Sequence, residues 1–155
     1  MKNYDVIVIG AGSVGLPLAH RLAAKGVSVG VIEELPSHGQ GQNKAAIGGI
    51  RATHSDRAKI KIGIASLDFI RRLEPEYGED VDYVEGGYLF PAYDEKIAQN
   101  LKSLLPFQKS HGLNIDWIGP EEVTEIVPGI RAEGLLGGTF SPEDGHLSSL
   151  KLAGA

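Results

Sequence analysis

The sequence predicts an α/β fold in which a parallel β-α-β unit, part of an incomplete sheet, is followed by an inserted α+β segment. Val6 to Ile9 is an unbroken β-branched run, which is typical of a strand buried on both faces. A glycine-rich turn and a helix with an apolar face follow this run, and Val27 to Ile32 is predicted to form a second strand. Nothing after Glu33 repeats this order cleanly, and residues 80 to 140 have the pattern of an antiparallel unit with its own helices.

The turn after the first strand contains three glycines, Gly10, Gly12 and Gly15, with the spacing G-x-G-x-x-G. The first allows a tight turn, the second lets a diphosphate approach the backbone, and the third lets the helix pack closely on the strand. The start of the helix offers unpaired N–H groups to phosphates. Glu33 ends the second strand, where its carboxylate can bind both hydroxyls of a ribose and would repel a 2′-phosphate. Together these features predict a Rossmann-like dinucleotide site.

Composition and charge exclude several classes of function. The chain has 155 residues and a formal net charge of −5, with no basic footprint, so nucleic acid is not an expected partner. It has no cysteine, which excludes disulfides, thiolate catalysis and cysteine-ligated metals, and we expect no metal site. No apolar run reaches roughly 18 residues, so we expect no membrane span, and a cytoplasmic location is the expected one.

Periodicity predicts the elements of the later part of the chain. Apolar residues spaced three or four apart predict helices, and β-branched or aromatic runs predict short strands. Pro91 indicates an edge strand or a bulge, and Pro106 is expected to kink or split its helix. The predicted helices are Asp56 to about Tyr77, about Glu95 to His111, Pro120 to Val127 and from Ser148 onwards, and the predicted strands are Gly87 to Tyr93, Ile115 to Ile118 and Leu135 to Phe140.

The long connection between the second strand and Arg51 is rich in Gly, Gln and Asn and has little periodicity. Connections of this length are usually functional. Gly48 and Gly49 let the backbone pass close to a flat or bulky group, although by themselves they also fit a plain turn. Arg51, which follows them, by itself also fits a cation on the protein surface. The aromatic residues that could line a pocket, but that more often belong to a core, are Tyr88, Phe90 and Trp117.

Several stretches together resemble one family. Asp5 to Glu33 is similar to its FAD-binding signature, and Gly41 to Arg51, ending in Gly-Gly-Ile-Arg, is similar to its loop towards the isoalloxazine ring. Glu85 to Lys96 and Gly119 to Gly129 resemble its substrate-domain segment, and Asp144 to His146 resembles the turn back to the flavin domain. The family is the FAD-dependent D-amino acid oxidase superfamily, in the branch with glycine oxidase, sarcosine oxidase and amino acid dehydrogenase subunits.

The resemblance implies a division of the chain. Residues 1 to 55 would form the FAD-binding β-α-β unit and flavin loop, 56 to 80 a long helix of the flavin domain, 81 to 140 a partial substrate domain, and 141 to 155 the return to the flavin domain. The match covers only about the first two-fifths of a typical member. We therefore expect a second chain or a C-terminal portion to complete the flavin domain, and the chain alone to be insufficient for catalysis.

The resemblance also implies roles for single residues, with FAD as the cofactor. Arg51 matches an arginine that pairs with the substrate carboxylate in sarcosine oxidases, and a guanidinium suits a carboxylate because it binds in a bidentate manner. His54 is a second candidate for the catalytic site. The residues that would contact FAD are Gly10, Gly12, Ser13, Val14, Gly15, Glu33, Glu34, Gly48, Gly49 and Ile50.

The implied function is part of an oxidoreductase that oxidises the C–N bond of a small amino acid or N-methyl amino acid by hydride transfer to flavin. Two alternatives stay open. The chain could be a non-catalytic nucleotide-binding or assembly subunit, whose open sheet edge docks to a partner. It could also be part of an NAD-binding dehydrogenase, because Glu33 suits NAD as well as FAD.

Overall fold

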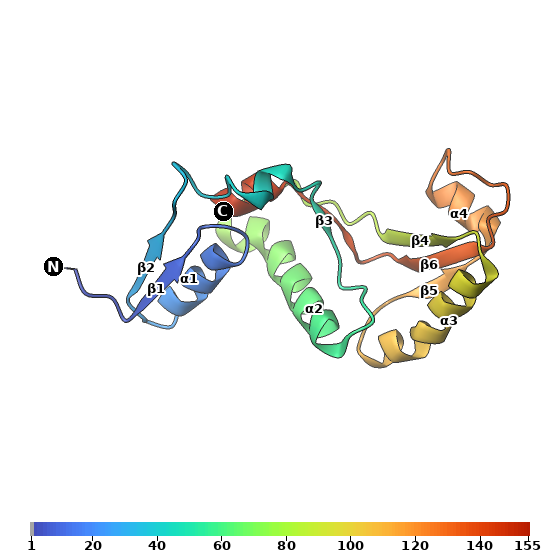
Figure 1. Ribbon diagram of the computed structural model, residues 1–155, viewed down its shortest axis with the longest axis horizontal. Coiled ribbons are helices and arrows are strands. Elements are labelled where there is room, and N and C mark those ends of the chain that lie inside the picture. Colours follow the sequence, from blue (N-terminus) through green and yellow to red (C-terminus); the bar gives the residue numbers. More distant parts are fainter. Residues whose placement is uncertain (1) are drawn as a thin grey trace. The chain divides into compact units, whose positions relative to one another are not determined.

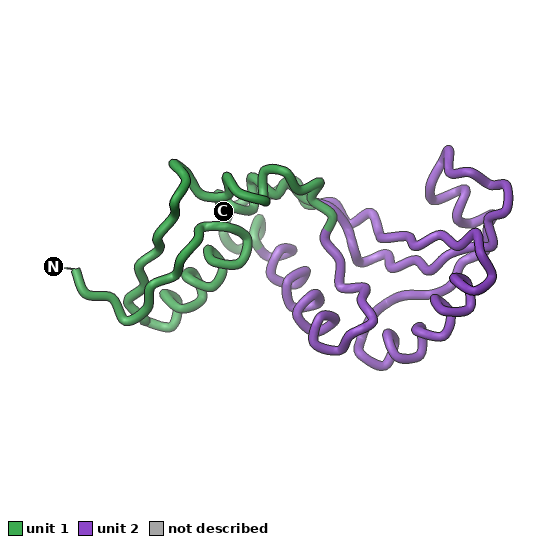
Figure 2. The backbone as a smooth tube through the Cα atoms, viewed as in Figure 1, with its two compact units in different colours: residues 1–49, 73–83, 147–155 green, residues 50–72, 84–146 purple. Residues whose placement is uncertain are grey.

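The computed structural model describes residues 2–155 (Figure 1). The chain folds into two compact units, which Figure 2 shows in different colours. Among the described residues, unit 1 contains residues 2–49, 73–83 and 147–155, and unit 2 contains residues 50–72 and 84–146. The limits expected for the flavin and substrate domains stay predictions.

Unit 1 contains the predicted β-α-β motif. Strand β1 (Val6–Ile9) pairs in parallel with β2 (Val29–Ile32), with Val6 opposite Val29, and α1 (Gly15–Ala23) connects the two. Within residues 2–155 this sheet has two strands, which confirms the expectation that it is incomplete. The parallel order is possible because α1 carries the chain back along the sheet between the two strands.

The second strand starts later than the sequence pattern suggests. We expected it from Val27, but the amide of Val27 donates to the carbonyl of Leu22 and still belongs to the end of the helix. Gly26, with φ of +80°, makes the turn out of the helix, as is usual for a glycine at this position. The amide of Ser28 then donates to the carboxylate of Asp5 at 3.0 Å, which aligns the two strands.

The remaining elements of unit 1 are short. They are η1 (Gln42–Ala45), the π-helical turn η2 (Leu73–Tyr77) and α5 (Ser149–Gly154). The helix predicted from Ser148 is confirmed, and the Ser148 hydroxyl caps it by accepting the amide of Lys151. Strand β7 (Gly145–His146) belongs to unit 2, and it pairs in a small two-stranded sheet with β3 (Gly49–Ile50), at whose Ile50 unit 2 begins.

Unit 2 is built on an antiparallel sheet with the strand order β4-β6-β5. Strand β6 (Gly137–Ser141) lies between β4 (Tyr88–Ala92) and β5 (Asp116–Ile118), which confirms the predicted antiparallel unit. Pro91 lies on the edge strand, as expected, opposite Gly138. The core of this unit centres on Ile118, Val123 and Leu135. Its helices are α2 (Arg57–Arg72), α3 (Glu95–Ser110) and α4 (Pro120–Ile126).

Two helix predictions need correction. Helix α3 is not split at Pro106 but runs through it, because Asp94 caps its start and buried residues such as Leu105 pack its inner face. The helix predicted to run to about Tyr77 is α-helical only as far as Arg72, and it continues to Tyr77 as a π-helical turn. Pro75 has no N–H group to continue the helical hydrogen-bond pattern, so the chain widens there into the π-helical turn η2.

Candidate cofactor and substrate sites

The glycine loop of unit 1 lies between β1 and α1. Gly10 has φ of +99°, which favours glycine, and its amide donates to the carbonyl of Ile32 at 2.7 Å. A Cβ atom on Gly15 would overlap the Gly10 carbonyl oxygen and lie 3.3 Å from Val8 Cγ1, so the helix can approach the strand only with glycine here. A Cβ atom on Gly12 would meet only the Asn43 side chain, at 3.4 Å. The backbone at Gly12 is therefore open to an approaching diphosphate, and the loop fits such a group.

Glu33 is brought directly to this loop. Its carboxylate accepts the amide of Ala11 at 2.6 Å and that of Leu35 at 2.9 Å. These two hydrogen bonds, the one from Leu35 first, lower the pKa of Glu33 below the ordinary value of a glutamate side chain. The ionised carboxylate keeps lone pairs that can accept hydroxyl groups. Glu34, which the resemblance also assigned to the cofactor, is exposed beside it.

Asn43 contacts the glycine loop, and no motif in the sequence assigns a role to this residue. Its side-chain oxygen accepts the amide of Ser13 at 3.2 Å. The next residue of the loop, Val14, is largely exposed. The Ser149 hydroxyl donates to the Asn43 carbonyl at 2.6 Å and so fixes the turn that carries this side chain. The polar composition of the loop was a signal of function, but no local pattern identifies Asn43 within it.

Gly48 has a structural reason to be glycine. It has φ of +84°, and a Cβ atom there would overlap the carbonyl oxygen of Leu147, whose amide donates to the Gly48 carbonyl at 3.0 Å. Gly49 and Ile50 follow as strand β3. The role that the resemblance gives to Gly48, Gly49 and Ile50, an approach to a flavin ring, stays a prediction.

In unit 2, Arg51 lies over two aromatic rings. Its Cζ atom is 5.2 Å from the centre of the Tyr88 ring and 5.0 Å from that of Phe90. The two rings are two residues apart on β4, so they share one face of the sheet, with their centres 5.4 Å apart. No carboxylate within residues 2–155 forms an ion pair with Arg51. Its guanidinium N–H groups therefore stay available to an anion.

His54 lies three residues after Arg51, in the same unit. Burial lowers the pKa of His54 below its usual value, and the positive charges of Arg51 and Lys59 lower it further. The nearby Asp144 and Asp56 oppose this shift. The imidazole is therefore mainly neutral at neutral pH, which suits a hydrogen-bonding group better than a second cation.

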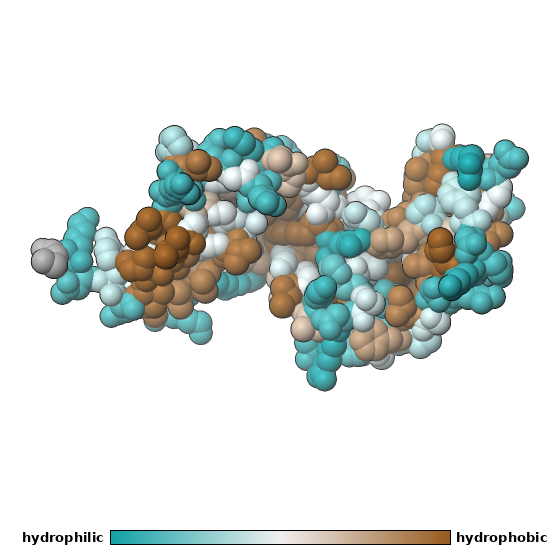
Figure 3. Space-filling view, viewed as in Figure 1, coloured by the Kyte–Doolittle hydropathy of each residue, from teal (hydrophilic) through white to brown (hydrophobic). Residues whose placement is uncertain are grey.

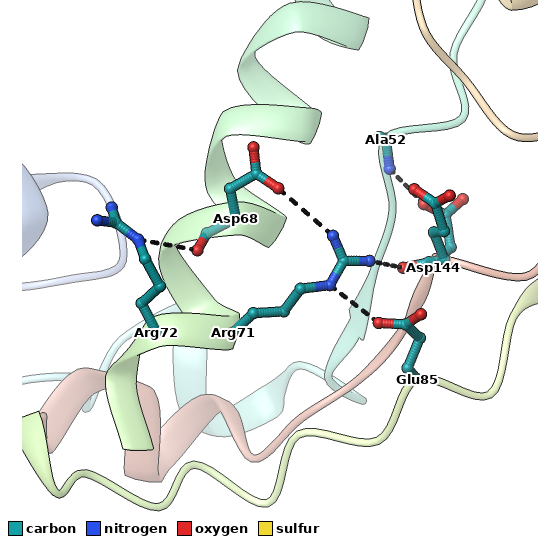
Figure 4. A network of polar contacts seen from close by, with 7 residues as sticks. Ala52, Asp68, Arg71, Arg72, Glu85 and Asp144 are labelled. Carbon is teal, nitrogen blue, oxygen red and sulfur yellow. Dashed lines mark hydrogen bonds and ion pairs between the residues drawn. The ribbon is translucent and has the colours of Figure 1, made fainter. Parts of the chain in front are cut away.

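Asp144 is almost fully buried, with 1 % of its surface exposed. Its carboxylate accepts the amide of Ala52 at 2.7 Å and the hydroxyl of Thr53 at 2.6 Å, and Figure 4 shows the Ala52 contact. The resemblance places Asp144 in a turn and assigns it no role of its own. A pocket of about 40 Å³ lies beside it, between Leu67, Asp68 and Arg71 of α2 and Ser141. That volume holds a few waters at most, so this pocket is too small for an amino acid.

Two groups of predicted site residues are thus assembled within their units. In unit 1 Glu33 contacts the glycine loop, and in unit 2 Arg51 lies over aromatic residues of β4. Within residues 2–155, no group of three His, Cys, Asp or Glu side chains could hold a metal ion. In the same range, no helix is both long and apolar enough to cross a membrane.

The chain is similar to proteins that act on small amino acids. It is 29% identical to glycine oxidase from Geobacillus kaustophilus, over 99% of this chain and 42% of that protein. It is 26% identical to monomeric sarcosine oxidase from a Bacillus species, over 95% of this chain and 38% of that protein. The crystal structure of L-proline dehydrogenase from P. horikoshii superposes with a TM-score of 0.91 at 29% identity, covering 99% of this chain and 40% of that one.

These relatives are longer than the chain, which spans about two-fifths of the length of glycine oxidase. The model of the family described as FAD dependent oxidoreductase matches residues 5–155. The match covers nearly the whole chain and confirms the resemblance, with FAD as the cofactor of the family. It also agrees with the mixed α/β fold and the incomplete sheets. The chain belongs to the FAD-dependent oxidoreductase family.

Proposed function

We propose that the chain is the FAD-binding N-terminal part of an enzyme that oxidises the C–N bond of a small amino acid or N-methyl amino acid. The observation that carries this proposal is Arg51. Its guanidinium is half-buried, lies over Tyr88 and Phe90, and forms no ion pair with a carboxylate of residues 2–155. An arginine held in this way is suited to bind the carboxylate of a substrate.

Each group of residues has a task in this proposal. The amides of the glycine loop would bind the diphosphate, and Glu33 would accept the hydroxyls of the ribose. Arg51 would bind the substrate carboxylate and so orient the carbon that carries the nitrogen. A flavin bound beside it would supply the acceptor for the hydride of this carbon, and the imine product would then be hydrolysed by water. No residue is needed as a base when the substrate amine is neutral.

The names of the relatives support this substrate class. Glycine oxidase, monomeric sarcosine oxidase and L-proline dehydrogenase are each named for a small amino acid, and the chain is 26% to 29% identical to them. The chain covers less than half of the length of each of these relatives, which also supports a partner polypeptide. We propose that a second chain or a C-terminal portion supplies the other strands of the flavin domain.

A non-catalytic assembly subunit is the second candidate. It is favoured by the apolar surface over β1 and β2, which Figure 3 shows and which includes Ile7, Ile9 and Ile32 on one face of the two strands. Such a surface suits a protein partner as well as the rest of a flavin domain. The NAD-binding dehydrogenase has only the shared ribose chemistry of Glu33 in its favour, and the family match disfavours it.

The proposal is tested with the chain assembled with the polypeptide that completes it. We expect a yellow complex whose flavin absorbance bleaches anaerobically with a small amino acid or N-methyl amino acid. Arg51→Lys should raise KM for that substrate about 10- to 100-fold, because a bidentate charge-assisted contact is lost. Lys102→Met, which removes a cation over Trp117 in the same unit, is the matched control and should leave KM unchanged.

Two results would contradict the proposal. A complex that is colourless and shows no bleaching would favour the assembly subunit. A coloured complex in which Arg51→Lys leaves KM unchanged would remove the role of Arg51.

A further inference from the structure

Residues 51 to 54 are held from several sides, and one buried side chain makes most of the contacts. We propose that Asp144 is a positioning residue that sets the guanidinium of Arg51 for carboxylate binding. This inference rests on the role proposed above for Arg51. Asp144 does not contact the guanidinium; it acts through the backbone that carries Arg51 and through the strand that carries the aromatic rings.

The first link is through the side chain of Asp144. Its two oxygens bind two successive residues, the amide of Ala52 at 2.7 Å and the hydroxyl of Thr53 at 2.6 Å. All three residues are buried, so water does not compete for these hydrogen bonds. Because Ala52 follows Arg51 directly, the bond to its amide fixes the peptide plane from which the Arg51 side chain departs.

The second link is through the backbone of Asp144. Its carbonyl oxygen accepts the amide of Gly87 at 2.8 Å. Gly87 precedes Tyr88, one of the two rings over which Arg51 lies. Gly87 has φ of +79°, and a Cβ atom there would overlap the Phe140 ring, so this approach requires glycine. One residue thus holds both the segment of the cation and the start of the strand beneath it.

The turn that contains Asp144 is itself fixed to α2. The guanidinium of Arg71 donates to the carbonyl of Glu143 at 3.0 Å and forms ion pairs with Glu85 at 2.9 Å and Asp68 at 3.4 Å (Figure 4). The Asp144 side chain therefore projects from an anchored backbone. A positioning residue needs such support if it is to hold a functional side chain within a fraction of an ångström.

The other end of the segment has its own support. The side chain of Gln108, also buried, donates to the carbonyl of His54 at 3.1 Å. Gly63 of α2 packs on the middle of the segment, where a Cβ atom would lie 2.6 Å from Ala52 Cα. Arg51 therefore has a fixed backbone without an ion pair of its own, which is the arrangement that a carboxylate ligand requires.

The experiment measures binding of a carboxylate by the full chain, without flavin. Acetate is titrated while the Nε–H signal of Arg51 is followed by NMR. Arg51→Met identifies the signal and should abolish the specific binding. Thr53→Val removes one hydrogen bond to Asp144, and Asp144→Asn replaces the charged acceptor; each should weaken acetate binding about 5-fold, because one buried hydrogen bond is lost.

Two further variants control for indirect effects. Thr53→Ser keeps the hydroxyl and should restore binding. Thr124→Val removes a threonine hydroxyl that donates to Glu121 in α4 of the same unit, and it should bind acetate as the wild type does. Thr53→Val keeps the inference testable even if Asp144→Asn does not fold.

The outcomes separate this inference from the proposed function. If the wild type binds acetate through Arg51 and Thr53→Val binds it equally well, Asp144 has only a structural role and the inference is wrong, while the role of Arg51 stands. If the wild type binds no acetate, or if Arg51→Met binds it as well, the role of Arg51 fails and the inference fails with it.

Discussion

The sheets of the two units differ in how completely their apolar residues are buried. In unit 1, the parallel strands β1 and β2 bury Val8 but leave Ile9 85 % exposed, and they leave three more β-branched residues on the surface. In unit 2, the antiparallel sheet packs against Val123 of α4, which is fully buried, and its strands bury Ala92, Ile118 and Thr139. Figure 3 shows the apolar surface of unit 1.

The difference follows from the kind of sheet. Parallel strands have helices or further layers on both faces, so their sequences are apolar on both faces. An antiparallel sheet needs only one covered face, and in unit 2 the helices provide it. The apolar surface of β1 and β2 is thus the physical basis for proposing a second chain or a C-terminal portion that completes unit 1.

The largest expected effect compares a buried residue of unit 2 with an exposed strand residue of unit 1. Leu135→Ala should cost about 2–5 kcal/mol of the free energy of unfolding, because it leaves a cavity beside Ile118 and Val123. Ile9→Ala should cost less than about 0.5 kcal/mol, because its side chain is already in water. Denaturant unfolding measures both, with the single tryptophan, Trp117, reporting on unit 2 and hydrogen exchange of β1 reporting on unit 1. Equal costs would remove the contrast between the units.

The second prediction repeats Ile9→Ala in the assembled protein. If the completing polypeptide covers β1, the same substitution should now cost about 2 kcal/mol, because the side chain is buried on assembly. The change is measured as the shift in unfolding between assembled wild type and variant. The cost of Leu135→Ala should not change and serves as the control. A cost for Ile9→Ala that stays near zero would mean that the partner does not cover this surface.

The third prediction separates two glycines of the same loop. Gly15→Ala should destabilise unit 1 by about 1–3 kcal/mol and weaken FAD binding, because its Cβ overlaps the Gly10 carbonyl. Gly12→Ala should weaken FAD binding without a comparable loss of stability, because its Cβ meets only Asn43 at an ordinary contact distance. Flavin fluorescence titration and hydrogen exchange measure the two quantities. Unchanged FAD binding in Gly12→Ala would argue against a diphosphate at this position.

The smallest expected effect concerns pH. The amides of Leu35 and Ala11 lower the pKa of Glu33 in the folded chain, so the ionised carboxylate stabilises unit 1. This contribution is complete above the pKa that Glu33 has in the unfolded chain and is lost as the pH falls through the lower pKa of the folded state. Hydrogen exchange of β1 measured between about pH 6 and pH 3 should show this loss in the wild type and not in Glu33→Gln. The same acid dependence in both proteins would show that another group causes it.

The sequence by itself determined the features whose partners are close along the chain. The run Val6 to Ile9 and the spacing of the three glycines each act within one element or one turn, so local pattern and turn chemistry predict them. The family resemblance added FAD and its assignment of residues. Pro106 was expected to kink or split its helix: the split is wrong, because packing of the inner helix face outweighs the cost of one proline, and the kink stays a prediction.

Only the tertiary structure decided which distant residues meet. The oxygen of Asn43 binds an amide 30 residues earlier, and Asp144 binds an amide 92 residues earlier. No periodicity reports such pairs, because they depend on how separate elements pack after the chain has closed long loops. The residues proposed to bind a cofactor or substrate could be named from motifs and the resemblance, whereas the buried residues that contact their segments became visible only when the strands and helices were assembled.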